Sequence, residues 1–266
     1  MKSLLACMIL SLVVFPRLTP LQAQQGSQWE FTVAPYIWFA GLEGDLTVGD
    51  REVDVDVDFS DILDSLDVAF LGQVEARKDP WGVFLQANYF KLNSDESEAR
   101  AAGPLGFERQ LDVDLETTLW LVEFGGSYTA FAWSGSGFPR HIRGDVLAGG
   151  RYWSVENDLE ATFTGPLTTR DVEAEQEIDW VDPIVGARVE VQLSDRILLA
   201  VRGDIGGFGI GDGSDFTWNL LGLLGYRFAS WATLWAGYRT LDVDYDNDAQ
   251  FDMTMQGPLA GLAFTF

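Results

Sequence analysis

The stretch that decides the fold is Gln256-Gly257-Pro258-Leu259-Ala260-Gly261-Leu262-Ala263-Phe264-Thr265-Phe266. In an extended chain, Leu262, Phe264 and Phe266 fall on one face. Upstream the same alternation recurs in segment after segment, with apolar residues and glycine on one face and charged or amide residues on the other. Strands of this kind satisfy every backbone hydrogen bond in lipid when they close into a ring. The pattern therefore predicts an all-β fold, a transmembrane antiparallel up-and-down β-barrel closed by the strand ending in Phe266.

The first residues predict export from the cytoplasm. A positively charged start, Met1-Lys2-Ser3, precedes an apolar stretch too short for a membrane-spanning helix, and Ala23 offers a small residue at a cleavage site. We therefore expect a cleaved signal peptide over residues 1–23 and one outer-membrane β-barrel domain over residues 24–266, located in the cell outer membrane. The single cysteine, Cys7, would leave with the signal peptide, so we expect no disulfide and no thiolate metal site.

Composition narrows the function classes. The net charge of −24 argues against binding nucleic acid through a basic surface. The 28 glycines and 10 tryptophans suit strands with aromatic girdles at the two membrane interfaces. The tryptophans expected in these girdles are Trp29, Trp38, Trp81, Trp133, Trp231 and Trp235.

The alternation predicts about ten strands. They are expected over residues 28–41, 67–79, 81–93, 114–132, 142–157, 177–194, 196–210, 216–230, 232–245 and 251–266. Short turns alternate with long loops over 42–66, 94–113 and 158–176, which places the short turns in the periplasm and the long loops outside. Eight or twelve strands remain alternatives, because Asp45 to Asp58 could form an extra hairpin.

The polar face of the strands predicts a charged lumen. The residues expected there are Glu75, Arg77, Glu123, Arg143, Asp145, Arg151, Asp182, Arg188, Glu190, Arg202, Asp204, Arg227 and Arg239. Seven arginines and six acids nearly balance, so they can pair with one another in a confined space. Two interpretations follow: a structural ionic core, or a narrow conduit or gate lined by these charges.

The first long loop has the most distinctive local sequence. Asp-x-Asp-x-Asp occurs at Asp54-Asp56-Asp58 and again at Asp242-Asp244-Asp246. Neither repeat has the glycine and the glutamate that an EF-hand loop requires, so that site is rejected, although divalent cations could bind these acidic loops loosely. The apolar spacing over 59–66 suggests a short amphipathic helix that could cap or plug the lumen, or alternatively a strand extension with a turn.

The sequence contains few residues of the kinds that barrel enzymes use for catalysis. Barrel enzymes of the protease and lipid-modifying kinds use a histidine near the extracellular rim, whereas the only histidine here, His141, follows a short turn that we place in the periplasm. We therefore expect no enzymatic activity and no catalytic, cofactor-binding or metal site. A membrane-embedded enzyme of those kinds is the disfavoured alternative.

Three stretches carry a family resemblance. Ala34-Pro35-Tyr36-Ile37-Trp38, Phe59-Ser60-Asp61-Ile62-Leu63-Asp64 and Gly237-Tyr238-Arg239, followed by Leu241-Asp242-Val243-Asp244-Tyr245, resemble a group of largely uncharacterised, small porin-like outer-membrane β-barrel proteins of Gram-negative bacteria. The resemblance implies the barrel fold, and it implies that Phe266 serves as an assembly signal read by the barrel-assembly machinery.

The sequence predicts only a broad class of function. We expect a narrow solute channel or a structural surface barrel with acidic extracellular loops. The expected partners are outer-membrane lipid and lipopolysaccharide, with divalent cations at the acidic loops and no nucleic acid.

Overall fold

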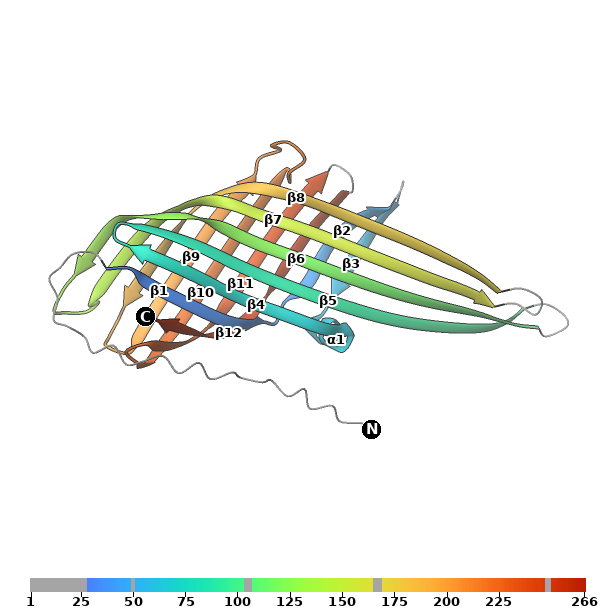
Figure 1. The fold of residues 1–266 in the computed structure, drawn as a ribbon, viewed down its shortest axis with the longest axis horizontal. Helices are drawn as coiled ribbons and strands as arrows, with labels where there is room; N and C mark the ends of the chain where they lie inside the picture. The colour runs from blue at the N-terminus through green and yellow to red at the C-terminus, as the bar shows by residue number, and fades with distance from the viewer. Residues whose placement is uncertain (1–27, 49–50, 103–106, 165–168, 247–249) are drawn as a thin grey trace.

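The computed structural model describes residues 28–48, 51–102, 107–164, 169–246 and 250–266 (Figure 1). The expected signal peptide, with Cys7, lies outside the described residues. The elements are β1 (Glu30–Trp38), β2 (Gly41–Val48), β3 (Arg51–Val57), α1 (Phe59–Ser65), β4 (Leu66–Lys78), β5 (Trp81–Ala102), β6 (Phe107–Ser134), β7 (His141–Thr164), β8 (Thr169–Gln192), β9 (Ile197–Gly207), β10 (Phe216–Ala229), β11 (Ala232–Asp246) and β12 (Gln250–Thr265).

Ten of these strands form a closed antiparallel ring, so the predicted barrel is confirmed. The order is β1-β4-β5-β6-β7-β8-β9-β10-β11-β12, and β12 pairs back with β1. The backbone groups of Phe266 and Phe31 bond to each other in both directions, which extends this closure one residue past the end of β12. The alternative hairpin within Asp45 to Asp58 also forms, as β2 and β3. This hairpin pairs with the outer half of β12, beyond the part of β12 that pairs with β1. It is not a member of the closed ring, so the barrel keeps ten strands.

The long loops were predicted wrongly in extent. The described parts of these loops, residues 94–102, 107–113, 158–164 and 169–176, continue β5, β6, β7 and β8 as two long hairpins, which project from one end of the barrel in Figure 1. The reason is physical: outside the membrane both faces of a strand meet water, so polar residues on both faces hide the two-residue period. The backbone hydrogen-bond ladder nevertheless continues without interruption.

The helix expected near 59–66 forms as α1, at the edge of the barrel wall. It lies against β2 and β5, and the ring of Phe59 meets that of Phe39 edge-on at 4.9 Å between centroids. Leu63 is 52% exposed, so α1 is a rim element and not a plug. A gap in the β1–β4 ladder lies beside it, because pairing ends at Pro35, which lacks a backbone donor. In the described part of the chain no helix has the length and apolarity to cross a membrane.

The outer surface carries an apolar band between two aromatic girdles. Trp81 and Tyr128 pair at the end with the short turns, and Tyr89 and Trp120 pair toward the long hairpins, with ring centroids 4.8 and 4.6 Å apart. Trp81 and Tyr89 are eight residues apart in β5, which spans about 26 Å along the strand and roughly 20 Å along a tilted barrel axis. This height is close to the apolar band of about 25 Å that such barrels carry.

Two of the six tryptophans expected in the girdles point into the barrel and not toward the membrane, so the prediction is wrong for them. Trp38 is only 2% exposed and lies inside the barrel, and Trp235 lines an internal cavity. The two-residue period already places them there, because Trp38 shares the inner face of β1 with Tyr36. Trp29, Trp81, Trp133 and Trp231 are exposed.

Candidate functional site

The lumen is the candidate site, because every residue of the expected charge network lies on the inner side of the barrel wall. Most of them gather into two groups of ion pairs. The mid-lumen cluster consists of Glu123, Arg151, Arg202, Asp204 and Arg239. The lower cluster, nearer the short turns, consists of Glu75, Arg77, Arg143, Asp145, Arg188 and Glu190.

Glu123 is the centre of the mid-lumen cluster. Its carboxylate accepts hydrogen bonds from Arg151 Nε at 3.3 Å and Arg202 Nη2 at 2.7 Å, and it also accepts one from Arg239 Nη2. Glu123 and Arg151 are both 0% exposed. A carboxylate this deeply buried is tolerated because three guanidinium groups replace its hydration shell.

Asp204, on β9, completes the cluster. Arg151 Nη2 lies 2.5 Å from one of its oxygens and Arg202 Nε lies 3.0 Å from the other. Sequence reasoning missed two uncharged members, Thr217 and Asn219, which accept hydrogen bonds from Arg151 and Arg239. Both stand at inward positions of β10, which is the signal that could have revealed them.

The lower cluster is built around a bidentate ion pair between Arg188 and Glu75. Arg188 Nη1 and Nη2 reach the two carboxylate oxygens of Glu75 at 2.9 and 2.8 Å, and Arg77 Nη2 reaches the same carboxylate at 2.7 Å. Asp145 bonds to Arg188 at 2.9 Å and to Arg143 at 2.9 Å. The cluster therefore ties β4, β7 and β8 together across the barrel interior.

Asp182 is buried without an arginine partner in the described part of the chain. Its carboxylate accepts hydrogen bonds from the indoles of Trp153 at 2.9 Å and Trp180 at 3.2 Å. The backbone N–H and the hydroxyl of Ser214 donate to it at 2.7 and 2.9 Å. The expectation of a mutually paired interior is not met at Asp182, where neutral donors take the place of a cation.

An apolar layer closes the lumen above the mid-lumen cluster. Its buried members are Trp38, Leu71, Leu121, Trp153, Trp180, Leu241, Val243, Tyr245 and Leu259. An aromatic cap, defined as Trp153, Trp180, Tyr245 and Phe251, lies in its outer part, with neighbouring rings 4.4–5.8 Å apart. The barrel interior is thus filled by side chains from the middle outward.

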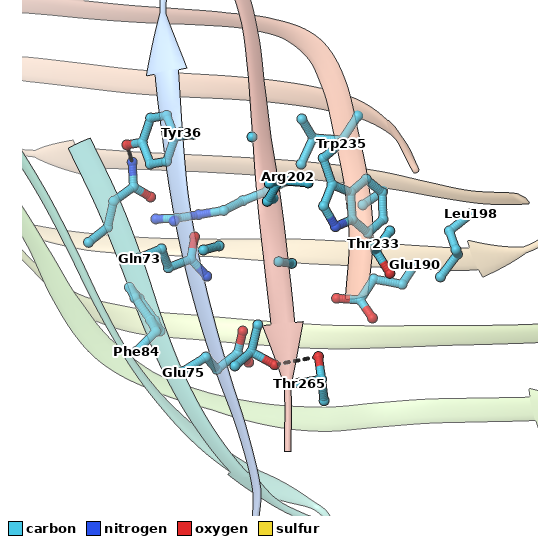
Figure 2. A pocket seen from close by; sticks show the side chains of 18 of the residues that line it. Tyr36, Gln73, Glu75, Phe84, Glu190, Leu198, Arg202, Thr233, Trp235 and Thr265 are labelled. Carbon is cyan, nitrogen blue, oxygen red and sulfur yellow. Dashed lines mark hydrogen bonds between the residues drawn. The ribbon is translucent and has the colours of Figure 1, made fainter. Parts of the chain in front are cut away.

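The half of the lumen near the short turns is hollow. A cavity of about 480 Å³ lies there, and Figure 2 shows Tyr36 and Gln73 on one side of it, Trp235 on the other, and Arg202 reaching between them. Arg227 also lines this cavity and has no carboxylate partner among the described residues. The expectation that Arg227 is paired inside the lumen is therefore not met.

These features decide the class of the protein: a closed ring, an apolar outer band and a polar interior. The chain is an outer-membrane β-barrel. No protein-family model and no curated protein matches it.

Solved structures similar to this barrel come from several Gram-negative bacteria. The translocator domain of the autotransporter NalP from Neisseria meningitidis is 12% identical, with 91% of this chain and 90% of that chain covered and a TM-score of 0.43. Ail, the attachment invasion locus protein of Yersinia pestis, solved with a heparin analogue, is 9% identical, with 90% and 98% covered and a TM-score of 0.34. The toluene transporter TodX of P. putida is 10% identical, with 91% and 90% covered and a TM-score of 0.28. At such identities, these likenesses concern fold alone.

The two Asp-x-Asp-x-Asp repeats meet on the outer face of the barrel, beyond the apolar band. Asp54 stands opposite Asp45, Asp45 opposite Asp252, and Asp252 opposite Asp244, so one row of four exposed acids crosses β3, β2, β12 and β11. Directly opposed residues have Cβ atoms about 5 Å apart, and like charges at that separation repel. Sequence reasoning missed this row because it depends on β2 pairing with β12.

Two carboxyl groups of this row have raised pKa values, from partial burial first and from neighbouring carboxylates second. Partial burial, then the charges of Asp215 and Asp242, hold the pKa of Asp244 above its usual value. Partial burial, then the charges of Asp242 and Asp244, raise the pKa of Asp252.

We expect the β2–β3 hairpin to become more stable as the pH falls from 7 toward 4. A carboxyl with a raised pKa binds more protons in the folded state than in the unfolded state, so acidification through that pKa favours the fold. Hydrogen exchange of the β2 amides measures the effect, and Asp252→Asn should reduce both the repulsion and the pH dependence. An unchanged pH dependence in Asp252→Asn would count against the repulsion. Calcium titration on the same two proteins tests the expected divalent cations.

Neither His141 nor the acidic group on the outer hairpins forms an identifiable catalytic or metal site among the described residues. His141 begins β7 at the end with the short turns, where its Nδ1 lies 2.7 Å from the Ser134 hydroxyl. Within the described residues, carboxylate oxygens of Glu156, Asp158 and Glu175 come within 4.8 Å of one another on the outer hairpins. Such groups are common on acidic surfaces, so this one does not identify a metal site.

Proposed function

We propose that this protein is a non-enzymatic surface barrel whose lumen does not conduct and whose projecting hairpins carry its function. The observation that carries the proposal is the filled interior. The mid-lumen cluster and the apolar layer above it occupy the cross-section, with Glu123, Arg151, Leu121 and Leu241 all 0% exposed. A barrel of ten strands is only slightly wider than the eight-stranded kind that side chains alone fill, so long side chains such as arginine and tryptophan can span it.

The hairpins support the second half of the proposal. β5 continues about thirteen residues past Tyr89 in the outer girdle, a reach of roughly 40 Å along the strand. The described side chains of this projection are strongly acidic, as an extracellular surface that stays soluble requires. The acids are Glu116, Glu156, Asp158, Glu160, Glu175, Glu177 and Asp179. Lipopolysaccharide and divalent cations are the partners we propose for this rim.

Planar-bilayer recording tests the closed lumen. Wild-type protein should insert without single-channel steps, because buried side chains occupy the cross-section at the mid-lumen cluster. Arg151→Ala should introduce a leak, since it removes a side chain that bridges Glu123 and Asp204. Arg196→Ala, in an exposed turn, is the matched control and should stay silent. Steady, ion-selective conductance of the wild type would replace the proposal with the narrow solute channel.

A further inference from the structure

The cavity at the end with the short turns has an unusual charge for this protein. Five arginines and three glutamates line it, although the whole chain carries a net charge of −24. The lining charges are Glu30, Glu75, Arg77, Arg188, Glu190, Arg202, Arg227 and Arg239. The side chains that line the cavity therefore carry more positive than negative charge, although the protein as a whole is strongly acidic.

Among the described residues, the ion pairs leave one of these five arginines without a carboxylate. Arg77 and Arg188 pair with Glu75, while Arg202 and Arg239 pair with Glu123. In the described part of the chain, Arg227 has no carboxylate and no side-chain hydrogen bond. Deeper in the lumen, Nη1 of Arg239 is buried and lacks a hydrogen-bond partner. A buried guanidinium N–H without a partner is costly unless an acceptor completes it, and the half-buried Arg227 offers an unpaired positive charge to an anion.

The same cavity has an apolar wall. Leu198, Leu221, Leu223, Trp235 and Leu259 line it together, on strands β9 to β12. The ring of Trp235 lies over Gly225, where an added Cβ would come within 2.6 Å of it, so this strand position leaves room for the indole.

Arg227 stands on the mouth side of that wall. It is opposite Thr233 in the β10–β11 ladder, one inward position nearer to the short turns than Gly225. A cation at the mouth with an apolar surface behind it is complementary to a ligand that has an anionic group and an apolar body.

We propose that this cavity binds a small organic anion with a compact apolar body, such as an aromatic carboxylate, entering from the periplasmic end. The anionic group meets Arg227 at the mouth, and the apolar body packs against Trp235 and the neighbouring leucines. A guanidinium group offers a carboxylate two parallel hydrogen bonds, which a neutral or cationic ligand cannot accept. The volume of about 480 Å³ lies in the range of small-molecule sites. This site requires no passage through the mid-lumen cluster, so it is independent of whether the barrel conducts.

Three probes with one apolar body test the charge preference: 2-naphthoate, 2-naphthol and 2-naphthylmethylammonium. Each is titrated into the folded barrel in a zwitterionic detergent, and binding is followed by the NMR signal of the Trp235 indole, assigned with Trp235→Phe. The protein signal reports the cavity and not probe partitioning into micelles. We expect saturable shifts with the naphthoate at the lowest concentration and weaker or no response to the cation.

Arg227→Gln should raise the Kd for 2-naphthoate about tenfold, the typical effect of losing one charge-assisted contact. Because Arg227 holds no ion pair, this variant should fold normally. Arg196→Gln removes the same charge from an exposed turn at the same end and should leave the Kd unchanged. Equal effects of the two variants would overturn the assignment of Arg227.

A steric variant provides a second test that does not depend on charge. Ala200→Phe fills the cavity from β9 and should abolish the response to all three probes. Ala187→Phe adds the same ring on the lipid side of β8 and serves as its control. Binding that survives Ala200→Phe, or binding of the cation as tight as that of the naphthoate, would overturn the proposal.

Discussion

Glu123→Gln is expected to lower the free energy of unfolding of the barrel by about 3–5 kcal/mol, the usual cost of removing one partner from a buried ion-pair network. Glutamine has nearly the same shape, so the loss reflects charge. Three arginines meet at Glu123, and without its carboxylate only Asp204 remains to balance them within the mid-lumen cluster. The three guanidinium groups, all buried, would then repel one another with little screening by water.

Urea unfolding in detergent or lipid vesicles, followed by tryptophan fluorescence, measures this loss. Glu177→Gln is the matched control, because it makes the same chemical change at an exposed position of β8 and should shift stability by about half a kcal/mol or less. If the two variants unfold at the same urea concentration, the mid-lumen cluster does not stabilise the barrel and the closed-lumen proposal loses its physical basis.

The barrel and the inner face of each strand were predictable because alternation is a property of each strand by itself. Arg143, Asp145 and Arg151 share one face of β7 whatever the neighbouring strands do. Which residues then meet depends on the stagger of strands far apart in sequence. Arg239 on β11 reaches Glu123 on β6 across the lumen, a separation of 116 residues. No local pattern encodes that encounter.

The ends of the strands were harder to predict for a different reason. Inside the membrane, lipid forces one face to be apolar, and the alternation marks the strand. Beyond the girdles that requirement ends, so the continuation of β5 to Ala102 leaves no periodic signal. The row of opposed aspartates on β2, β3, β11 and β12 was hidden similarly, because it arises only when β2 takes up the outer part of β12.

Asp182→Ala is the second substitution with a large expected effect, because this carboxylate fixes a loop inside the mouth of the barrel. The loop over 208–215 contains Phe208 at a φ of 62°, a left-handed conformation that side chains rarely adopt. Contacts elsewhere must therefore hold it. Ser214, which is fully buried, supplies them through its N–H and hydroxyl bonds to Asp182.

Alanine at position 182 would remove the acceptor of the Ser214 amide, the Ser214 hydroxyl and the Trp153 indole, whereas the Trp180 indole keeps its hydrogen bond to the Ser214 hydroxyl. Each buried donor without a partner costs about 1–3 kcal/mol, so we expect a loss of at least about 3 kcal/mol, concentrated in the loop. Hydrogen exchange should show the Ser214 amide losing protection while amides of β6 near Glu123 keep theirs. Asp179→Ala, three residues earlier on β8 and exposed, should change neither.

Conductance of Asp182→Ala shows whether the aromatic cap or the mid-lumen cluster seals the barrel. The aromatic cap holds its rings partly through Asp182, which bonds to both cap tryptophans, whereas the mid-lumen cluster below does not depend on it. A loosened loop with a silent bilayer recording would show that the mid-lumen cluster seals the barrel by itself. If Asp182→Ala leaves the Ser214 amide fully protected, the loop is held by other contacts, and the positioning role assigned to Asp182 is wrong.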